Sequence, residues 1–177
     1  MTGPVASAGR NQALALLAQG LTGARAASAP LIYMWIGHGD LGLAASAVAA
    51  ALLSDCADGP LVRRFGAPSA AGAWFDVWAD FLVIVAAFGG LAAAGMVPSW
   101  PLLPICLSFA LFVATSHKRP VLHDPVGRYI GGILMVLALV LLTLPDLLVQ
   151  ETVLWTSAIA CMITMLGRLA YVLPRGR

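Results

Sequence analysis

Six long apolar segments, separated by short polar connections, constrain the fold of this chain more than any other feature. A helix that crosses a bilayer needs about 20 mostly apolar residues, within a range of roughly 17–25. The segments are 22–37, 41–63, 70–95, 102–116, 128–145 and 150–172. They are too long and too continuous for the alternating strands of a membrane β-barrel. We therefore expect an all-α, polytopic membrane protein with six transmembrane helices.

The composition disfavours a soluble domain. Hydrophobic residues make up 60% of the 177 residues and charged residues only 10%, whereas soluble domains carry about 25% charged residues. A chain of this length could bury a core, but it has too few polar groups to cover one. The solvent around most of the chain is therefore expected to be lipid.

A short amphipathic stretch precedes the first apolar segment. Residues 10–20, RNQALALLAQG, place leucines beside glutamines, a pattern typical of a helix that lies in the membrane interface. We expect one domain over 1–177, divided into a short N-terminal interfacial helix within 1–21 and a six-helix bundle over 22–172.

The basic residues predict the orientation of the six spans. They fall at the termini or in every second connection: Arg10, Arg25, Arg63, Arg64, Lys118, Arg119, Arg128, Arg168, Arg175 and Arg177. Lys and Arg accumulate on the cytoplasmic side of membrane proteins. This pattern predicts that both termini lie in the cytoplasm. We expect an integral protein of a bacterial cytoplasmic membrane.

Four of the eight acidic residues lie in one stretch, DCADGPLVRRFGAPSAAGAWFDVWAD, over residues 55–80. Asp55 and Asp58 are three residues apart, and Asp76 and Asp80 are four apart, so each pair shares a helix face. Two antiparallel helices joined by 60–69 would point all four carboxylates at one volume on the cytoplasmic side.

Such a cluster favours divalent cations. Four carboxylates this close cannot all stay ionised without compensating charge. Carboxylate oxygens select Mg²⁺ or Mn²⁺, and four of them can hold two ions in a phosphoryl-transfer site. The alternative, in which these acids cap helices or pair with Arg63 and Arg64, would account for one or two of them, and charges inside a membrane are costly.

The same stretch resembles the signature of the CDP-alcohol phosphatidyltransferase family, D-x2-D-G-x2-A-R-x8-G-x3-D-x3-D. The residues in register are Asp55, Asp58, Gly59, Arg63, Gly72, Asp76 and Asp80. Val62 departs from the pattern, because the family has alanine there. Upstream, LTGARAASAP over 21–30 resembles the L-T-x2-R-x4-P of the phosphatidylglycerophosphate synthase branch.

The resemblance implies a homodimeric six-helix membrane enzyme of phospholipid biosynthesis. It would transfer the phosphatidyl group of CDP-diacylglycerol, or a similar CDP-linked lipid, to the hydroxyl of a small alcohol and release CMP. Membrane lipids would surround it, and no nucleic-acid partner is expected. By resemblance, the ligands of two Mg²⁺ or Mn²⁺ ions are Asp55, Asp58, Asp76 and Asp80. The CDP contacts are Asp58, Gly59, Arg63 and Gly72, and the catalytic base is Asp80.

The acceptor alcohol is less constrained. Lys118, Arg119 and Arg128 in the second basic connection could hold an acceptor phosphate, or they could serve only to fix the topology. The upstream match favours glycerol 3-phosphate. Against it, Val77 and Phe81 stand where that branch has proline and lysine.

Two other functions fit an acidic membrane cluster. An intramembrane prenyltransferase also binds magnesium diphosphate through aspartates, but its acidic motifs lie on distant helices. A cation transporter usually binds its ion near the midplane, between repeated halves. Here the acids lie on one predicted hairpin and no internal repeat is visible, which favours the phosphatidyl transferase.

Overall fold

The computed structural model describes residues 4–65, 70–116, 127–144 and 146–172, with side chains over 19–55, 71–116, 129–144 and 146–170. These residues form six α-helices and no strand, which confirms the all-α class. The helices are α1 (Pro4–His38), α2 (Leu41–Phe65), α3 (Ala70–Ala93), α4 (Leu102–Ser116), α5 (Gly127–Thr143) and α6 (Leu147–Val172).

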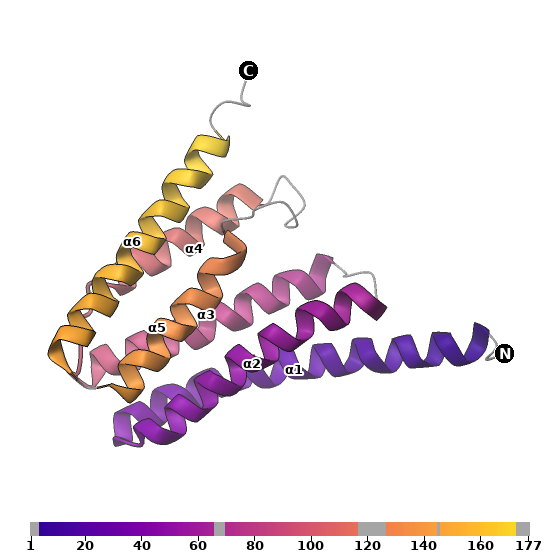
Figure 1. Ribbon diagram of the computed structural model, residues 1–177, viewed down its shortest axis with the longest axis horizontal. Helices are drawn as coiled ribbons and strands as arrows, with labels where there is room; N and C mark the ends of the chain where they lie inside the picture. Colours follow the sequence, from indigo (N-terminus) through magenta and orange to yellow (C-terminus); the bar gives the residue numbers. More distant parts are fainter. Residues whose placement is uncertain (1–3, 66–69, 117–126, 145, 173–177) are drawn as a thin grey trace.

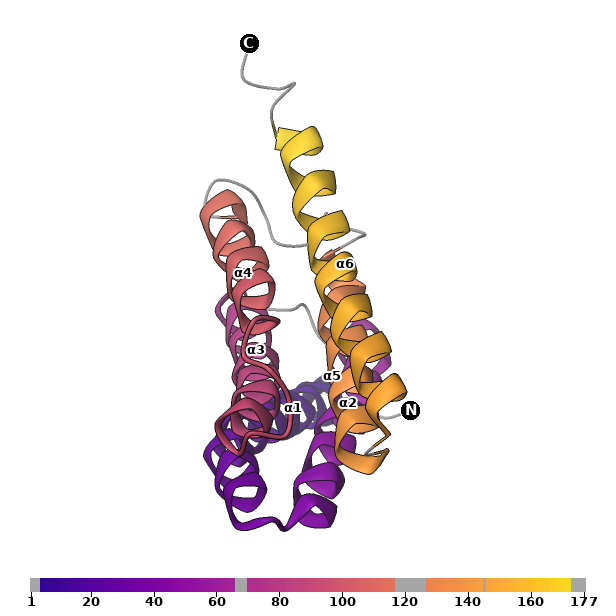
Figure 2. The same cartoon turned by 90° about the vertical axis from the view of Figure 1, so that its left-hand side faces the viewer.

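The helices form a bundle in which α1 holds α2 and α3 together. Helix α1 packs against both of them, α2 also packs against α5, and α6 packs against α4 and α5. In Figure 2, α3 and α4 lie on one side of the bundle and α5 and α6 on the other. The first half of α1 extends away from the other helices (Figure 1).

The prediction of a separate short helix within 1–21 is wrong, because the structure has a single helix, Pro4–His38, through that stretch. No proline lies between residues 5 and 29. Gly20 and Gly23 weaken a helix by about 1 kcal/mol each without ending it. Pro30 lies inside the helix and removes one backbone donor, but the helix continues. An interfacial position for this first half stays a prediction.

Small side chains bring α1 and α3 into close contact. A Cβ atom at Gly90 would lie 3.0 Å from Cδ1 of Ile36, and Ile36 and Phe88 are fully buried in the core beside it. A Cβ contact of this length is tighter than nine in ten real ones, so a side chain at residue 90 would require Ile36 to shift. The absence of a side chain at Gly90 therefore lets α1 and α3 approach closely at this point.

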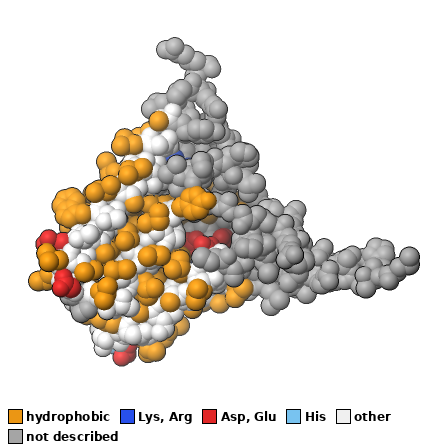
Figure 3. Space-filling model, viewed as in Figure 1, with side chains coloured by type: hydrophobic (Ala, Val, Ile, Leu, Met, Phe, Trp, Pro, Cys, Tyr) orange, Lys and Arg blue, Asp and Glu red, His pale blue; other side chains and the backbone are white. Residues whose placement is uncertain are grey.

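Two helices are long and apolar enough to cross a membrane, Ala71–Ala93 and Leu147–Ala170. Three shorter apolar helices accompany them among the described residues, Leu41–Asp55, Leu102–Ser116 and Tyr129–Thr143. Large apolar side chains such as Leu53, Leu148 and Leu166 are exposed, and hydrophobic groups are spread over the described surface in Figure 3. These features fit a membrane protein, while six spans stay a prediction.

Candidate active site

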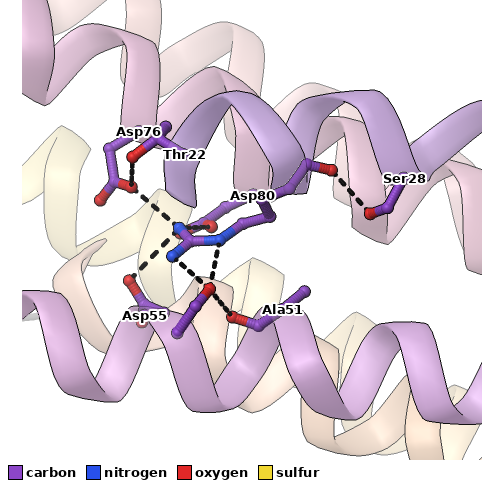
Figure 4. Close-up of polar contacts among 8 residues, drawn as sticks. Thr22, Ser28, Ala51, Asp55, Asp76 and Asp80 are labelled. Atoms are coloured by element: carbon purple, nitrogen blue, oxygen red, sulfur yellow. Dashed lines mark hydrogen bonds and ion pairs between the residues drawn. The ribbon is translucent and has the colours of Figure 1, made fainter. Parts of the chain in front are cut away.

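Three carboxylates converge where α1, α2 and α3 meet. Asp55 comes from α2, and Asp76 and Asp80 come from successive turns of α3. One ligand oxygen from each lies within 4.8 Å of the other two. Figure 4 shows the three side chains turned toward a common centre. The predicted convergence of the two acidic pairs is thus seen for the three aspartates whose side chains are described.

A buried arginine from α1 occupies the centre of this cluster. Arg25 is 3% exposed. Its Nη1 donates to Oδ1 of Asp76 at 2.8 Å and to Oδ1 of Asp80 at 2.7 Å. The same nitrogen lies 3.7 Å from Oδ1 of Asp55. One guanidinium therefore bridges all three carboxylates, and charge-assisted hydrogen bonds of this kind are about twice as strong as neutral ones.

The opposite edge of the guanidinium is anchored on α2. Nε and Nη2 of Arg25 donate to Oγ of Ser54 at 3.2 and 2.9 Å. The Ser54 hydroxyl in turn donates to the carbonyl of Ala51 at 2.8 Å. Because both edges of the planar group are engaged, its orientation is fixed and Nη1 is held between the aspartates.

A threonine one turn before the arginine adds a further contact to α3. Thr22 is buried, and its Oγ1 donates to Oδ1 of Asp76 at 3.3 Å. Thr22 and Arg25 are three residues apart and so share one face of α1. Helix α1 therefore supplies two of the groups that hold Asp76 in place.

Sequence reasoning assigned no site role to Thr22, Arg25 or Ser54. Arg25 entered only as a topological charge and as part of the upstream match. One signal could have indicated a role for Arg25. It is the fourth residue of the apolar segment 22–37, and a charged side chain in such a segment needs a partner. Thr22 also belongs to the upstream match over 21–30. Ser54 carried no such signal, since serine is common in helices of all kinds.

Charge explains what this cluster can hold. When all three carboxylates are ionised, these side chains carry two more negative charges than the one guanidinium balances. The side chains of Asp55 and Asp76 are 33% and 36% exposed, so both can be reached from outside the cluster. Oxygen donors in this arrangement suit a hard divalent cation such as Mg²⁺ or Mn²⁺.

The remaining predicted site residues are less fully described. Gly72 lies on α3, one turn before Asp76. The side chains of Asp58, Gly59 and Arg63, near the end of α2, lie outside the described residues. Lys118 and Arg119 also lie outside them. Arg128 is in the first turn of α5, but its side chain is not among those described.

A second buried arginine joins α6 to the end of α4. Nη1 of Arg168 donates to the Phe112 carbonyl at 3.3 Å and to the hydroxyls of Thr115 and Ser116 at 2.5 and 3.2 Å. Its guanidinium carbon also lies 4.3 Å from the centre of the Phe112 ring. A cation at a helix C-terminus is favourable because the last carbonyls carry partial negative charge. These contacts assign Arg168 to helix packing.

The comparison with known proteins agrees with this geometry. Residues 15–166 match the model of the CDP-alcohol phosphatidyltransferase family, and the match contains all three converging aspartates and Arg25. No solved structure matches the chain significantly. The family consists of transferases for substituted phosphate groups, which move a phosphatidyl group from a CDP-alcohol to an alcohol. Because the match covers most of its length, the chain belongs to the CDP-alcohol phosphatidyltransferase family.

Proposed function

We propose that this enzyme transfers the phosphatidyl group of CDP-diacylglycerol, or a similar CDP-linked lipid, to a small alcohol during phospholipid biosynthesis. The observation that carries the proposal is the convergence of Asp55, Asp76 and Asp80 at one point, in a chain of this family. Neither a prenyltransferase nor a transporter is favoured by any contact of the described residues.

The carboxylates fit a divalent metal site. Their ligand oxygens come from two helices, lie within 4.8 Å of one another and are hard donors of the kind Mg²⁺ and Mn²⁺ prefer. Asp58 would complete the set, and two ions are expected. When bound, such ions neutralise the diphosphate of the donor and so favour attack by an oxygen nucleophile.

The protein groups then carry out binding and proton transfer. Asp58, Gly59, Arg63 and Gly72 are proposed to hold the CDP portion. Asp80 is proposed to accept the proton of the acceptor hydroxyl, whose oxygen forms a bond to the phosphatidyl phosphorus. The bond from that phosphorus to the CMP oxygen breaks, and CMP leaves. A base within hydrogen-bond reach of the hydroxyl typically contributes about 10²–10⁴ in rate.

For the acceptor we propose glycerol 3-phosphate. The support is the upstream match over 21–30 and the three basic residues that could hold its phosphate, Lys118, Arg119 and Arg128. An arginine in that group suits a phosphate, since its fork of donors binds two oxygens at once.

The proposed setting is a bacterial cytoplasmic membrane, which the protein crosses six times as a homodimer with both termini and the active site on the cytoplasmic side. The distribution of Lys and Arg supports the orientation, and the two long apolar helices support membrane insertion. The homodimer is supported by family resemblance.

An assay of the purified protein tests the reaction. The protein receives CDP-diacylglycerol, Mn²⁺ or Mg²⁺ and a panel of labelled alcohols, and both CMP and lipid product are measured. We expect equal amounts of CMP and labelled lipid, with glycerol 3-phosphate as the preferred acceptor. CMP without labelled lipid would indicate hydrolysis and contradict the proposal.

The variant Asp80→Asn tests the catalytic base. It removes the proton acceptor and one ligand charge while keeping the size of the side chain, so we expect transfer to fall by about 10²–10⁴. Gel filtration in detergent serves as the control for folding. Undiminished turnover in a folded Asp80→Asn variant would remove Asp80 from both roles.

A further inference from the structure

The two carboxylate oxygens of Asp80 have different surroundings. Oδ1 accepts the hydrogen bond from Nη1 of Arg25 at 2.7 Å. Oδ2 faces α5, where a Cβ atom at Gly131 would lie 3.7 Å from it. Leaving aside the neighbouring residues and the backbone of α5 itself, Oδ2 is the single atom of the described residues within 4 Å of this Cβ position.

Arg25 distinguishes the two oxygens of Asp80. Arg25 keeps its proton under all ordinary conditions, and its other edge is fixed by two hydrogen bonds to Ser54. One side of Oδ1 is therefore occupied by a permanent donor. Oδ2 is the oxygen that this donor does not contact, and it lies on the side of α5.

Residue 131 presents no side chain to Oδ2, because it is glycine. A hydroxyl that gives its proton to Oδ2 must come within about 2.6–3.2 Å of it. A methyl group at position 131, 3.7 Å away on the same side, would compete with the acceptor for that space. The contact is not a clash, so packing alone does not demand glycine here, in contrast with Gly90, where a Cβ would meet Ile36 at 3.0 Å.

We infer that the acceptor hydroxyl reaches Oδ2 of Asp80 through the space beside Gly131, and that Gly131 sets the size of alcohol that can react. The inference rests on the proposed function, in which Asp80 is the base. The position of Arg128, which the sequence predicts for the acceptor site, is three residues earlier on α5. Residues at that spacing share a helix face, so an acceptor bound there could present its hydroxyl beside residue 131.

The test compares Gly131→Ala with Gly132→Ala. Both replace glycine by alanine inside α5, which favours the helix, and a Cβ at Gly132 meets nothing within 4 Å among the described residues. For Gly131→Ala we expect kcat/KM for the acceptor to fall about ten- to a hundredfold, as for one extra methyl group in a binding site. The KM for the CDP donor should not change. In Gly131→Val the kcat/KM for the acceptor should fall further, and in Gly132→Ala it should equal the wild-type value.

Two further measurements separate this inference from a structural effect and from the proposed function. Mn²⁺ binding should be the same for wild type, Gly131→Ala and Gly132→Ala. The melting temperatures of the two variants in detergent should equal each other and lie no lower than that of the wild type, because both changes favour the helix. Suppose that the wild type forms lipid product with an alcohol. The inference is then wrong, while the proposed function stands, if Gly131→Ala has unchanged acceptor kinetics or loses donor and acceptor binding equally. If the wild type forms no lipid product with any alcohol, both are wrong.

Discussion

At the residue scale, Arg25 organises the site more than any single aspartate does. It is almost fully buried, and Nη1 alone contacts Asp55, Asp76 and Asp80 at 2.7–3.7 Å. A buried charge is stable only when it is paired, and each carboxylate here shares the same partner. The arginine therefore acts as an internal counter-cation, and it fixes which oxygens of Asp76 and Asp80 are left for ligands.

Replacing Arg25 should destabilise the protein and make its stability depend on metal. Arg25→Ala leaves three nearby carboxylates without this cation. We expect the free energy of unfolding to fall by about 2 kcal/mol, a value between those for buried and exposed ion pairs, because the carboxylates are partly exposed. Mn²⁺ should restore part of the melting temperature by taking the place of the lost charge. The measurement is thermal unfolding in detergent with and without Mn²⁺.

The control for this prediction is Ser46→Ala, since Ser46 is exposed and its hydroxyl donates to the Gly42 carbonyl of its own helix. A second variant, Arg25→Lys, keeps the charge but lacks the fork that holds Ser54, so it should be more stable than Arg25→Ala and still impaired in transfer. An Arg25→Ala protein as stable as the Ser46→Ala control, with or without Mn²⁺, would contradict the role of counter-cation.

The site residues divide into those that sequence spacing could reveal and those that it could not. Asp55, Asp76 and Asp80 were predictable because helix periodicity places the α3 pair on one face and a short connection brings α2 back beside it. Arg25 is 51 residues before Asp76, and its contact depends on how α1 packs. No local rule gives that packing.

At the scale of elements, α1 is the helix that the sequence described least well. The predicted site lay on an α2–α3 hairpin, but α1 packs against both helices and contributes the arginine. Two contacts define its register on α3: Arg25 with Asp80, and Ile36 with Gly90. The two contacts are 11 residues apart on α1 and 10 residues apart on α3, in the same order along both helices, so α1 and α3 run parallel.

Helix limits were more predictable than helix packing. The apolar segments 102–116 and 128–145 nearly coincide with α4 and α5, because apolar length is a local property. The relative placement of α1, α2 and α3 depends instead on small residues such as Gly90, whose importance shows only when its neighbour is known. The continuity of α1 was missed for a related reason, since a change of amphipathic pattern does not by itself end a helix.

A side chain at Gly90 should therefore disturb the site from a distance. In Gly90→Val the new atoms would push against Ile36, where even a Cβ lies 3.0 Å from Cδ1 and 3.3 Å from Cβ. Overpacking of this kind costs about 1–3 kcal/mol, and a shift of α1 would move Arg25 relative to Asp80. We expect a lower melting temperature together with reduced transfer activity.

The matched control is Gly89→Val, one residue earlier on α3, where a Cβ meets nothing within 4 Å among the described residues. Both variants carry the same cost of placing valine in a helix, so the difference between them isolates the α1–α3 contact. Equal melting temperatures for the two variants would show that this contact does not position α1.

At the scale of the whole molecule, the two ends of α3 differ in chemistry. The acidic cluster lies in its first half, and Ala93 follows Asp80 by 13 residues, or about 20 Å along the helix. Beyond that end, the rings of Trp100 and Trp155 lie 4.9 Å apart and are both exposed. Tryptophans are enriched where a membrane meets water, so these rings fit the prediction that the α3–α4 connection lies at the membrane surface away from the site.

This polarity predicts the sidedness of the protein. If the basic connections are cytoplasmic, the connection at Ser99, which is exposed and has no charged neighbour between 96 and 101, must lie outside the cytoplasm. The test uses a chain in which Cys56, Cys106 and Cys161 are replaced, with a single cysteine introduced as Ser99→Cys or Ser69→Cys. In spheroplasts, a maleimide that cannot cross the membrane should label Ser99→Cys and not Ser69→Cys, whereas both should react after permeabilisation. Labelling of Ser69→Cys alone would show the opposite orientation. Labelling of both variants in intact spheroplasts would contradict an odd number of spans between the two positions. The predicted pattern would place Asp80 toward the cytoplasm.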